Sequence, residues 1–279
     1  MTDSELPAPV ESHTVEAIRA ELDKQGSTRR RRITEKFLIA AIGSIPWVGG
    51  FAAAAASIRG DESAGRADDL RTKWLEEHER KLGELESTLN AIDERMEKLG
   101  PGIEERIESH EYLTLVRKAF QTWDRAETEE KRRYIGNLLS NAAGTRICSD
   151  DVIRLFIAWL DTYHESHFSV IREIFQNPGS TRYDIWTELY GPTPREDSAE
   201  ADLYKLLFRD LTMGSVIRQA RDTNEIGQFL RKRPAHRRRP APAVMESAFE
   251  DTKGYVLTEL GKQFVHYTMS EVVPRLGGG

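Results

Sequence analysis

The segment from Phe37 to Ile58 is 22 consecutive residues without a charged side chain, in a chain in which 31% of residues are charged. An uncharged stretch of this length can span a lipid bilayer as one helix or fill a protein core. It must be removed from water in either case, so it constrains the fold more than any other feature of the sequence. Immediately before it lie four consecutive cations that an anionic lipid surface would attract, Arg29, Arg30, Arg31 and Arg32.

Residues in the middle of this run predict a turn rather than one continuous helix. Pro46 removes a backbone hydrogen-bond donor, and Gly49 and Gly50 have low helix propensity. We therefore expect a helical hairpin, with short apolar helices near Ile33–Ile45 and Phe51–Arg59, neither long enough to span a bilayer. The hairpin residues expected to meet lipid or other helices are Phe37, Leu38, Ile39, Ile42, Ile45, Pro46, Trp47, Val48 and Phe51.

Two environments suit this hairpin. It can lie at the inner face of an anionic membrane, with the arginines on the lipid headgroups. Alternatively it can be buried in the chain's own core or in an oligomer interface, where the small side chains of Ala52–Ala56 allow close helix contact. A single transmembrane span is disfavoured because it would export the highly charged residues after Arg59.

Composition narrows the class of protein further. The 279 residues leave room for two modest domains, and the net charge of −6 disfavours bulk affinity for nucleic acid. The one cysteine, Cys148, excludes an internal disulfide and a multi-cysteine metal site. The first residues do not form a signal peptide. We expect a cytoplasmic protein, either free or peripheral at the inner face of the membrane.

Apolar residues recur in steps of three and four between residues 75 and 99, which predicts a long helix with a coiled-coil-like seam. Leucine rather than a β-branched residue fills most a positions, so the pattern does not select a parallel dimer. The partner is either a second chain or an antiparallel helix of this chain, such as the one after Gly100-Pro101-Gly102. The predicted seam residues are Leu75, His78, Leu82, Leu85, Leu89, Ile92, Met96 and Leu99.

Further amphipathic patterns follow within Ile103–Trp123, Glu129–Ala143 and Val152–Leu160. The last is apolar on nearly all sides, so we expect it to be the central helix. Residues 66–162 are thus predicted to form a coiled-coil and helical bundle, which follows a loose segment, residues 1–28, and the basic run with the apolar hairpin, residues 29–60.

The C-terminal third has a different pattern. It predicts three helices, of which the third is capped by Asp197-Ser198 and covers Ala199–Thr212, followed by a strand over Ser215–Ala220. After a long polar loop, the sequence from Gly254 to Lys262 contains Tyr-x-Leu-Thr-x-x-Gly. This order and this motif resemble the winged-helix superfamily over residues 163–269, within a predicted domain of residues 163–270 that is followed by a flexible tail over residues 271–279. The resemblance implies a C-terminal winged helix-turn-helix domain of the α+β class.

In winged-helix proteins the third helix commonly enters the DNA major groove. Here that helix has a net acidic balance, because Glu200, Asp202 and Asp210 outnumber Lys205 and Arg209. This departure disfavours sequence-specific DNA recognition through the helix. Winged helices also serve as protein-interaction modules, and the fold does not choose between the two.

The predicted wing carries six positive charges in nine residues, with prolines that keep the segment extended. Such a cluster is either a solvated loop or a contact for phosphate groups of nucleic acid or lipid. Its members are Arg231, Lys232, Arg233, Arg237, Arg238 and Arg239.

Enzymatic motifs are weak throughout. Asp161, His164 and His167 have a spacing of three, which is common at helix ends, and Cys148 has no nucleophile context. Phosphate-cradling glycine loops are absent from the sequence. We expect neither catalysis nor a cofactor, metal or small-molecule substrate.

The sequence therefore predicts a mainly α-helical, non-enzymatic protein that self-associates or docks on another helical protein. The leading interpretation is a membrane-engaging effector or adaptor with a winged-helix interaction module; bacterial stress or phage-defence effectors offer an analogy. The alternative is a winged-helix DNA-binding regulator whose apolar hairpin is an oligomer core, with nucleic acid as the secondary partner.

Overall fold

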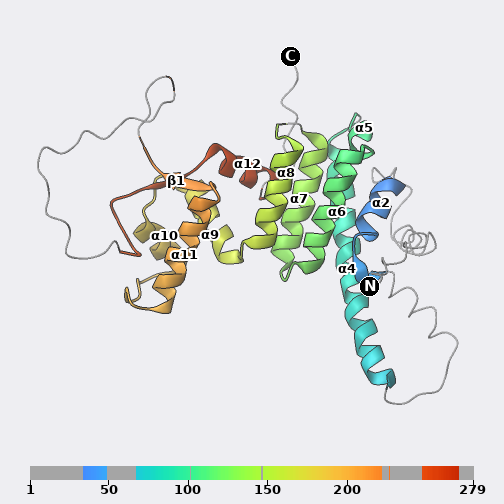
Figure 1. Cartoon of the computed structure of the whole chain (residues 1–279), viewed down its shortest axis with the longest axis horizontal. Helices are drawn as coiled ribbons and strands as arrows, with labels where there is room; N and C mark the ends of the chain where they lie inside the picture. The colour runs from blue at the N-terminus through green and yellow to red at the C-terminus, as the bar shows by residue number, and fades with distance from the viewer. Residues whose placement is uncertain are drawn as a thin grey trace, which may run out of the picture. The chain divides into compact units, whose positions relative to one another are not determined.

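The structure is a computed structural model that describes residues 34–48, 67–100, 102–145, 147–221, 226 and 247–269 (Figure 1). Of residues 67–76 it describes the helical backbone alone. The chain divides into two compact units, the helical unit of residues 1–162 with 267–279, and the helix–strand unit of residues 163–266. The described residues confirm a mainly α-helical protein with a small two-stranded antiparallel sheet. No helix among them combines the length and apolar character needed to cross a bilayer.

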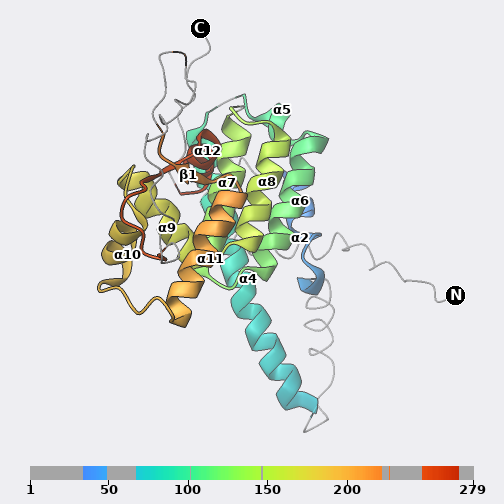
Figure 2. The same cartoon turned by 60° about the vertical axis from the view of Figure 1, so that its left-hand side comes forward.

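All secondary-structure elements in the described part of the helical unit are helices. Side-chain caps begin several of them, because Ser109, Thr128 and Thr34 each accept a hydrogen bond from a backbone N–H of the first turn. α6, α7 and α8 lie side by side in both views (Figures 1 and 2). The elements are α2 (Glu35–Ile42), α4 (Ala67–Lys98), α5 (Glu104–Ile107), α6 (His110–Arg125), α7 (Glu129–Gly144) and α8 (Asp150–Thr162).

The central helix of this unit is α7, whereas the sequence pattern indicated α8. Most α7 residues are buried, including the polar side chains of Asn137, Ser140 and Asn141. Leu155 of α8 is 39% exposed, so one side of that helix faces solvent. The pattern of apolar residues underestimates the burial of α7, because several of its buried side chains are amides and hydroxyls. Hydrogen bonds satisfy these polar groups, as burial requires.

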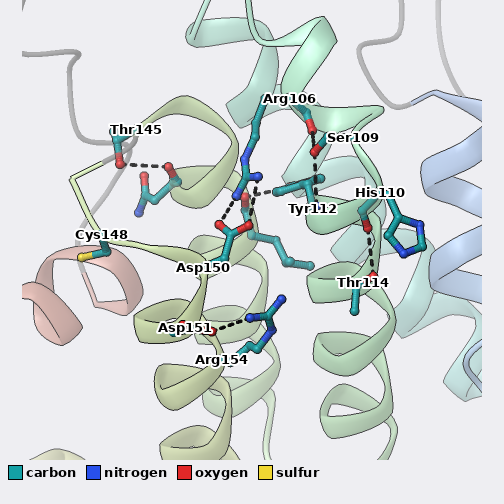
Figure 3. Close-up of polar contacts among 12 residues, drawn as sticks. Arg106, Ser109, His110, Tyr112, Thr114, Thr145, Cys148, Asp150, Asp151 and Arg154 are labelled. Carbon is teal, nitrogen blue, oxygen red and sulfur yellow. Dashed lines mark hydrogen bonds and ion pairs between the residues drawn. The ribbon is translucent and has the colours of Figure 1, made fainter.

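An arginine–carboxylate pair joins α5 to α8 (Figure 3). The two terminal nitrogens of the Arg106 guanidinium donate to the two carboxylate oxygens of Asp150, and the guanidinium lies 5.3 Å from the centre of the Tyr112 ring. The Tyr112 hydroxyl donates to the carbonyl of Leu139, and burial raises its pKa. This bidentate geometry fixes α5 against the ends of α6 and α8.

The long helix α4 runs past the other helices of its unit (Figures 1 and 2). Its C-terminal half packs against α7 of the same chain, where Gly144 lies so close to Leu99 that an added Cβ would be 2.5 Å from a leucine methyl carbon. Glu84 of α4 and Arg132 of α7 form an ion pair. Glu84 comes before Leu99 along α4, and their respective partners Arg132 and Gly144 come in the same order along α7. The two helices therefore run parallel.

The described residues of the helix–strand unit form three helices, a two-stranded sheet and most of a fourth helix. Ser198 caps α11 and a Thr181–Asp184 capping box begins α10. β1 pairs antiparallel with β2, with Ile217 opposite Leu257. The elements are α9 (Glu165–Gln176), α10 (Arg182–Tyr190), α11 (Ala199–Met213), β1 (Ile217–Gln219), β2 (Tyr255–Leu257) and α12 (Glu259–Thr268), whose last two residues belong to the helical unit.

An aromatic cluster forms the core between α10, α11 and β2. Tyr204 and Phe208 are both buried, with ring centroids 5.0 Å apart in an edge-to-face arrangement. The Phe208 ring also meets Tyr255 of β2 at 4.8 Å, and Trp186 of α10 meets Tyr204 at 5.0 Å. These contacts hold α11 beside the strand pair and so define the surface described next.

Candidate functional site

A groove with a volume of about 630 Å³ lies on the helix–strand unit, where the C-terminal half of α11 meets the two strands. Residues from α10, α11, β1 and β2 line it, so distant parts of the sequence come together there. The lining residues are Arg182, Lys205, Phe208, Arg209, Thr212, Met213, Arg218, Gln219, Arg221 and Tyr255. We call this surface the basic groove.

The basic groove has a strongly one-sided charge. Five of its lining residues are arginine or lysine, and none of the described lining residues carries a carboxylate. Lys205, Arg209 and Thr212 come to it because positions three or four apart share one face of a helix. A concave surface lined by cations concentrates anions and attracts them from a distance.

Two carboxylates that pair with lining cations lie beside the groove rather than in its lining. Lys205 Nζ is 3.6 Å from a carboxylate oxygen of Glu196, and Arg209 Nε is 3.6 Å from one of Asp210. Both pairs are partly exposed to solvent, where such ion pairs contribute little stability. An incoming anion can therefore compete for these cations at small cost.

Arg182 differs from the other lining cations. It is the first residue of α10, directly after the N-cap Thr181, and its guanidinium carbon lies 5.2 Å from the centre of the Phe208 ring and 5.5 Å from that of Tyr255. Its Nε is buried without a hydrogen-bond partner, and its side chain has no ion pair among the described residues. The Tyr204 hydroxyl donates to its backbone carbonyl over 2.8 Å. Contacts with two aromatic rings thus position the guanidinium, and the Tyr204 hydrogen bond holds the backbone of Arg182.

The aromatic rings of the basic groove are not available to nucleobases. Phe208 is completely buried and Tyr255 is 2% exposed, and the Arg182 guanidinium covers part of both rings. Base stacking requires an exposed ring face. The chemistry that the groove offers is therefore charge and hydrogen-bond donation to an anion.

The acidic residues of α11 do not line the groove. Glu200 and Asp202 lie in the first turn, where carboxylates are favourable near the helix N-terminus. Asp210 Oδ2 lies 3.9 Å from Nε2 of His167. The net acidic balance of the whole helix, on which the sequence argument against DNA binding depended, does not describe the face that borders the strands.

The described half of the apolar run lies in the core of the helical unit. Phe37 is completely buried between α6 rings, 6.3 Å from Tyr112 and 6.2 Å from Phe120, and Ile39 alone is markedly exposed among the apolar residues of α2, at 49%. Buried with Phe37 are Leu38, Ile42, Ile45 and Val48. Of the two environments that the sequence left open, this half occupies the protein's own core.

Of the other residues predicted for the hairpin and the basic segments, the structure describes Trp47 and Pro46 but not Phe51 or the arginines and lysine. Trp47 is half-buried and its Nε1 donates to Asp124 Oδ1 over 2.6 Å, whereas Pro46 is exposed. Phe51 and the N-terminal arginines lie outside the described residues. The same holds for the predicted wing cations Arg231, Lys232, Arg233, Arg237, Arg238 and Arg239.

The predicted seam lies on α4 and divides into two parts. Two seam residues, Leu82 and Leu99, are half-buried. The residues that are buried where α4 packs on α7 are Leu85, Leu89, Ile92 and Met96. His78 is 8% exposed, with its ring 4.9 Å from that of Trp47. The side chain of Leu75 lies outside the described residues. Association with a second chain through this seam stays a prediction.

The weak metal and nucleophile candidates do not form a site. Asp161 is ion-paired with Arg125 over 3.1 Å, and His167 Nδ1 accepts a hydrogen bond from the backbone N–H of His164. The described residues contain no cluster of ligands able to hold a metal ion. Cys148 is buried, and this burial raises the pKa of its thiol, which disfavours the reactive thiolate.

Sequence reasoning missed Arg182, Arg218 and Arg221 as members of one surface. The available signal was the spacing of Lys205 and Arg209, four residues apart on α11, followed by two arginines around the strand. Comparisons with protein-family models, with curated proteins and with solved structures find no match for this chain. Its function is therefore inferred from the chemistry of the site.

Proposed function

We propose that this protein binds nucleic acid through the basic groove of its helix–strand unit, which acts as a winged-helix module. The observation that carries the proposal is the lining of the groove, which contains five cations and no carboxylate among its described residues. Neutralising phosphates with lysine and arginine is the main source of affinity for nucleic acid. A local basic surface provides it even in a chain whose net charge is −6.

The order of elements supports a winged-helix module. Three helices precede β1, the antiparallel strand β2 follows a long connection, and α12 comes directly after it. In winged-helix proteins the third helix and the strand pair with its wing face nucleic acid. Here the third helix is α11, and its C-terminal half borders the same groove as the strands.

The groove favours the phosphate backbone over base sequence. Guanidinium and ammonium groups dominate its lining, and the aromatic rings are buried. Contacts to phosphate position a protein on nucleic acid but carry no sequence information. We therefore propose binding that is largely independent of sequence and strongly dependent on salt.

In this proposal the helical unit is the part that self-associates or docks on a helical partner. The membrane-engaging effector inferred from the sequence ranks second, because Phe37 and Ile42 would have to leave a packed core before they could contact lipid. The catalytic role that the sequence disfavours is not part of the proposal.

Fluorescence anisotropy with labelled duplexes of unrelated sequence tests the proposal. We expect the full chain to bind them with similar affinity, and Arg209→Ala with Arg218→Ala to lower the slope of log K against log salt by about 2. Arg195→Ala is the matched control, because Arg195 is an exposed cation of the same unit that pairs with Asp197 outside the groove. The proposal is wrong if no duplex binds at low salt, or if the control weakens binding as much as the double variant.

A further inference from the structure

We propose that Arg182 forms a discrete phosphate subsite in the basic groove, with its guanidinium binding two oxygens of one phosphate group. This inference rests on the proposed function, because it assigns the contact that the groove makes with a nucleic-acid ligand. Three observations support it: the position of Arg182 against two buried rings, the absence of a carboxylate partner among the described residues, and its place in a cationic groove.

The position of the guanidinium is fixed before any ligand binds. It lies 5.2 Å from the centre of the Phe208 ring and 5.5 Å from that of Tyr255, and these two rings contact each other edge to face. Cation–π contacts of this kind orient the planar group and reduce its freedom. Less conformational entropy is then lost when an anion binds.

Within the part of the chain that the structure describes, the same guanidinium has no charge partner. Its Nε is buried without a hydrogen-bond acceptor, and no carboxylate pairs with it among the described residues. A partly buried charge that is neither paired nor fully hydrogen-bonded raises the free energy of the folded state. A bound anion would offset this cost, so the subsite favours an occupied state.

Two other lining cations have carboxylate neighbours. Lys205 lies near Glu196 and Arg209 near Asp210, each at 3.6 Å. When a ligand binds these two cations, it replaces part of their existing contacts with carboxylates. Arg182 has no such contact with a described carboxylate, and we therefore assign to it the directional contact with phosphate. The cations near the rim attract the ligand by charge.

The planar guanidinium matches a phosphate group, because two parallel N–H donors reach two of its oxygens. Lysine carries the same charge but cannot provide this fork. The phosphate can come from the backbone of a nucleic acid, from the end of a strand or from free inorganic phosphate. All three share the chemistry, and the experiment below separates them.

Arg182→Lys and Arg218→Lys form a matched pair that keeps the charge and removes one guanidinium each. In duplex-binding measurements we expect Arg182→Lys to weaken binding by about 10-fold, the size of a lost charge-assisted hydrogen bond, and Arg218→Lys by about 2-fold or less. A preference of the wild type for 5′-phosphorylated over 5′-hydroxyl strands assigns the subsite to a strand end; equal binding assigns it to the backbone.

Inorganic phosphate provides a readout that does not depend on nucleic acid. We expect sodium phosphate to raise the melting temperature of the wild type and of Arg218→Lys above its value in sodium chloride of equal ionic strength, but not that of Arg182→Lys. Phosphate should also displace duplex from the wild type more effectively than chloride, which tests the subsite even where Arg182→Lys fails to fold.

The outcomes separate the two proposals. Duplex binding that responds equally to Arg182→Lys and Arg218→Lys overturns the subsite and leaves the proposed function standing. A wild type that binds no duplex overturns the proposed function; phosphate-dependent stabilisation lost in Arg182→Lys then assigns the subsite to free phosphate. If phosphate and chloride act alike on the wild type in both measurements, the subsite is wrong.

Discussion

The side-chain amide of Asn141 donates a hydrogen bond to the backbone carbonyl of Tyr267 over 2.9 Å, and both residues are completely or nearly completely buried. Asn137, one turn earlier on α7, donates in the same way to the carbonyl of Thr268 over 2.7 Å. The last carbonyls of a helix have no partner within it. Two asparagines of the central helix therefore supply the bonds that the end of α12 lacks.

Replacing Asn141 by leucine should lower the free energy of unfolding by about 1–3 kcal/mol, because it leaves the buried carbonyl of Tyr267 without this donor. Urea denaturation monitored by circular dichroism measures the change. Thr114→Ala is the control, because its hydroxyl donates to His110 within an exposed turn of α6, and its loss should cost less than about 0.5 kcal/mol. Equal effects of the two substitutions would contradict the role of Asn141.

The apolar residues of α2 offer a matched pair for the packing of the N-terminal segment. Phe37 is fully buried against α6, whereas Ile39, two residues later, is 49% exposed. Phe37→Ala should cost about 3–5 kcal/mol because it leaves a cavity, and Ile39→Ala about 1 kcal/mol or less. If denaturation shows equally small effects at both positions, α2 is not packed on the bundle in solution and the membrane hypothesis gains support.

The Thr-x-x-Gly sequence from Thr258 to Gly261 has a structural explanation. The Thr258 hydroxyl donates to the carbonyl of Ser215 over 2.6 Å and accepts from the N–H of Gly261 over 2.9 Å. A Cβ on Gly261 would lie 2.1 Å from the carbonyl oxygen of Val216, which belongs to the backbone before β1. The motif thus allows α12 to begin directly against the start of β1.

Gly261→Ala should therefore destabilise the protein by more than about 2 kcal/mol, because a backbone clash of this kind forces the helix and strand apart. Gly83→Ala provides the opposite expectation, since an added Cβ at this exposed position of α4 meets nothing within 4 Å. Alanine there should stabilise the helix by about 0.5–1 kcal/mol. Thermal melts of the two variants check both signs, and a melting temperature of Gly261→Ala at or above that of the wild type would refute the close approach.

Alkaline stability should depend on Tyr163. Burial, and secondly the negative charge of Asp210, raises the pKa of this phenol to about 12, above its usual value near 10. The folded protein then holds the proton more tightly than the unfolded chain, so the contribution to stability is complete below pH 10 and is lost as the pH rises toward 12. Tyr163→Phe should make the free energy of unfolding decline less steeply across this interval, as urea titrations at successive pH values would show. An unchanged slope would contradict the shift.

Local features of the fold could be predicted from the sequence because they depend on nearby residues. The cap at Ser198 and the glycine at 214 bracket a predicted helix that the structure places at Ala199–Met213. The strand predicted over Ser215–Ala220 contains β1. The central position of α7 could not be predicted in the same way, because hydrogen bonds from Asn137 and Asn141 to distant residues make its polar side chains compatible with burial.

The basic groove was not predictable because its members share no local pattern. Arg182 and Tyr255 come from opposite ends of the helix–strand unit's sequence and meet through packing around Phe208. Charge summed along α11 includes Glu200 and Asp202 of its first turn, which lie outside the lining. Only the three-dimensional arrangement separates the cationic face of that helix from the rest.

The six cations between β1 and β2 give a final prediction that links the sequence to the proposed function. They follow Arg221, a lining residue of the groove, by 10 to 18 positions in the sequence and lie outside the described residues. If they contact phosphates, replacing all six by alanine should lower the magnitude of the salt slope of duplex binding beyond the effect of the groove variants, by up to about 5. The substituted cations are Arg231, Lys232, Arg233, Arg237, Arg238 and Arg239.

Flotation with vesicles rich in anionic lipid is the parallel measurement for this six-alanine variant. We expect duplex binding to fall in the variant and the wild type to show no vesicle binding, because these cations would add phosphate contacts to those of the basic groove. Vesicle binding that disappears in the variant while duplex binding persists would instead assign the cluster to lipid and favour the membrane-engaging effector. No loss in either assay would identify the cluster as a solvated loop and confine phosphate contact to the groove formed by α11 and the strands.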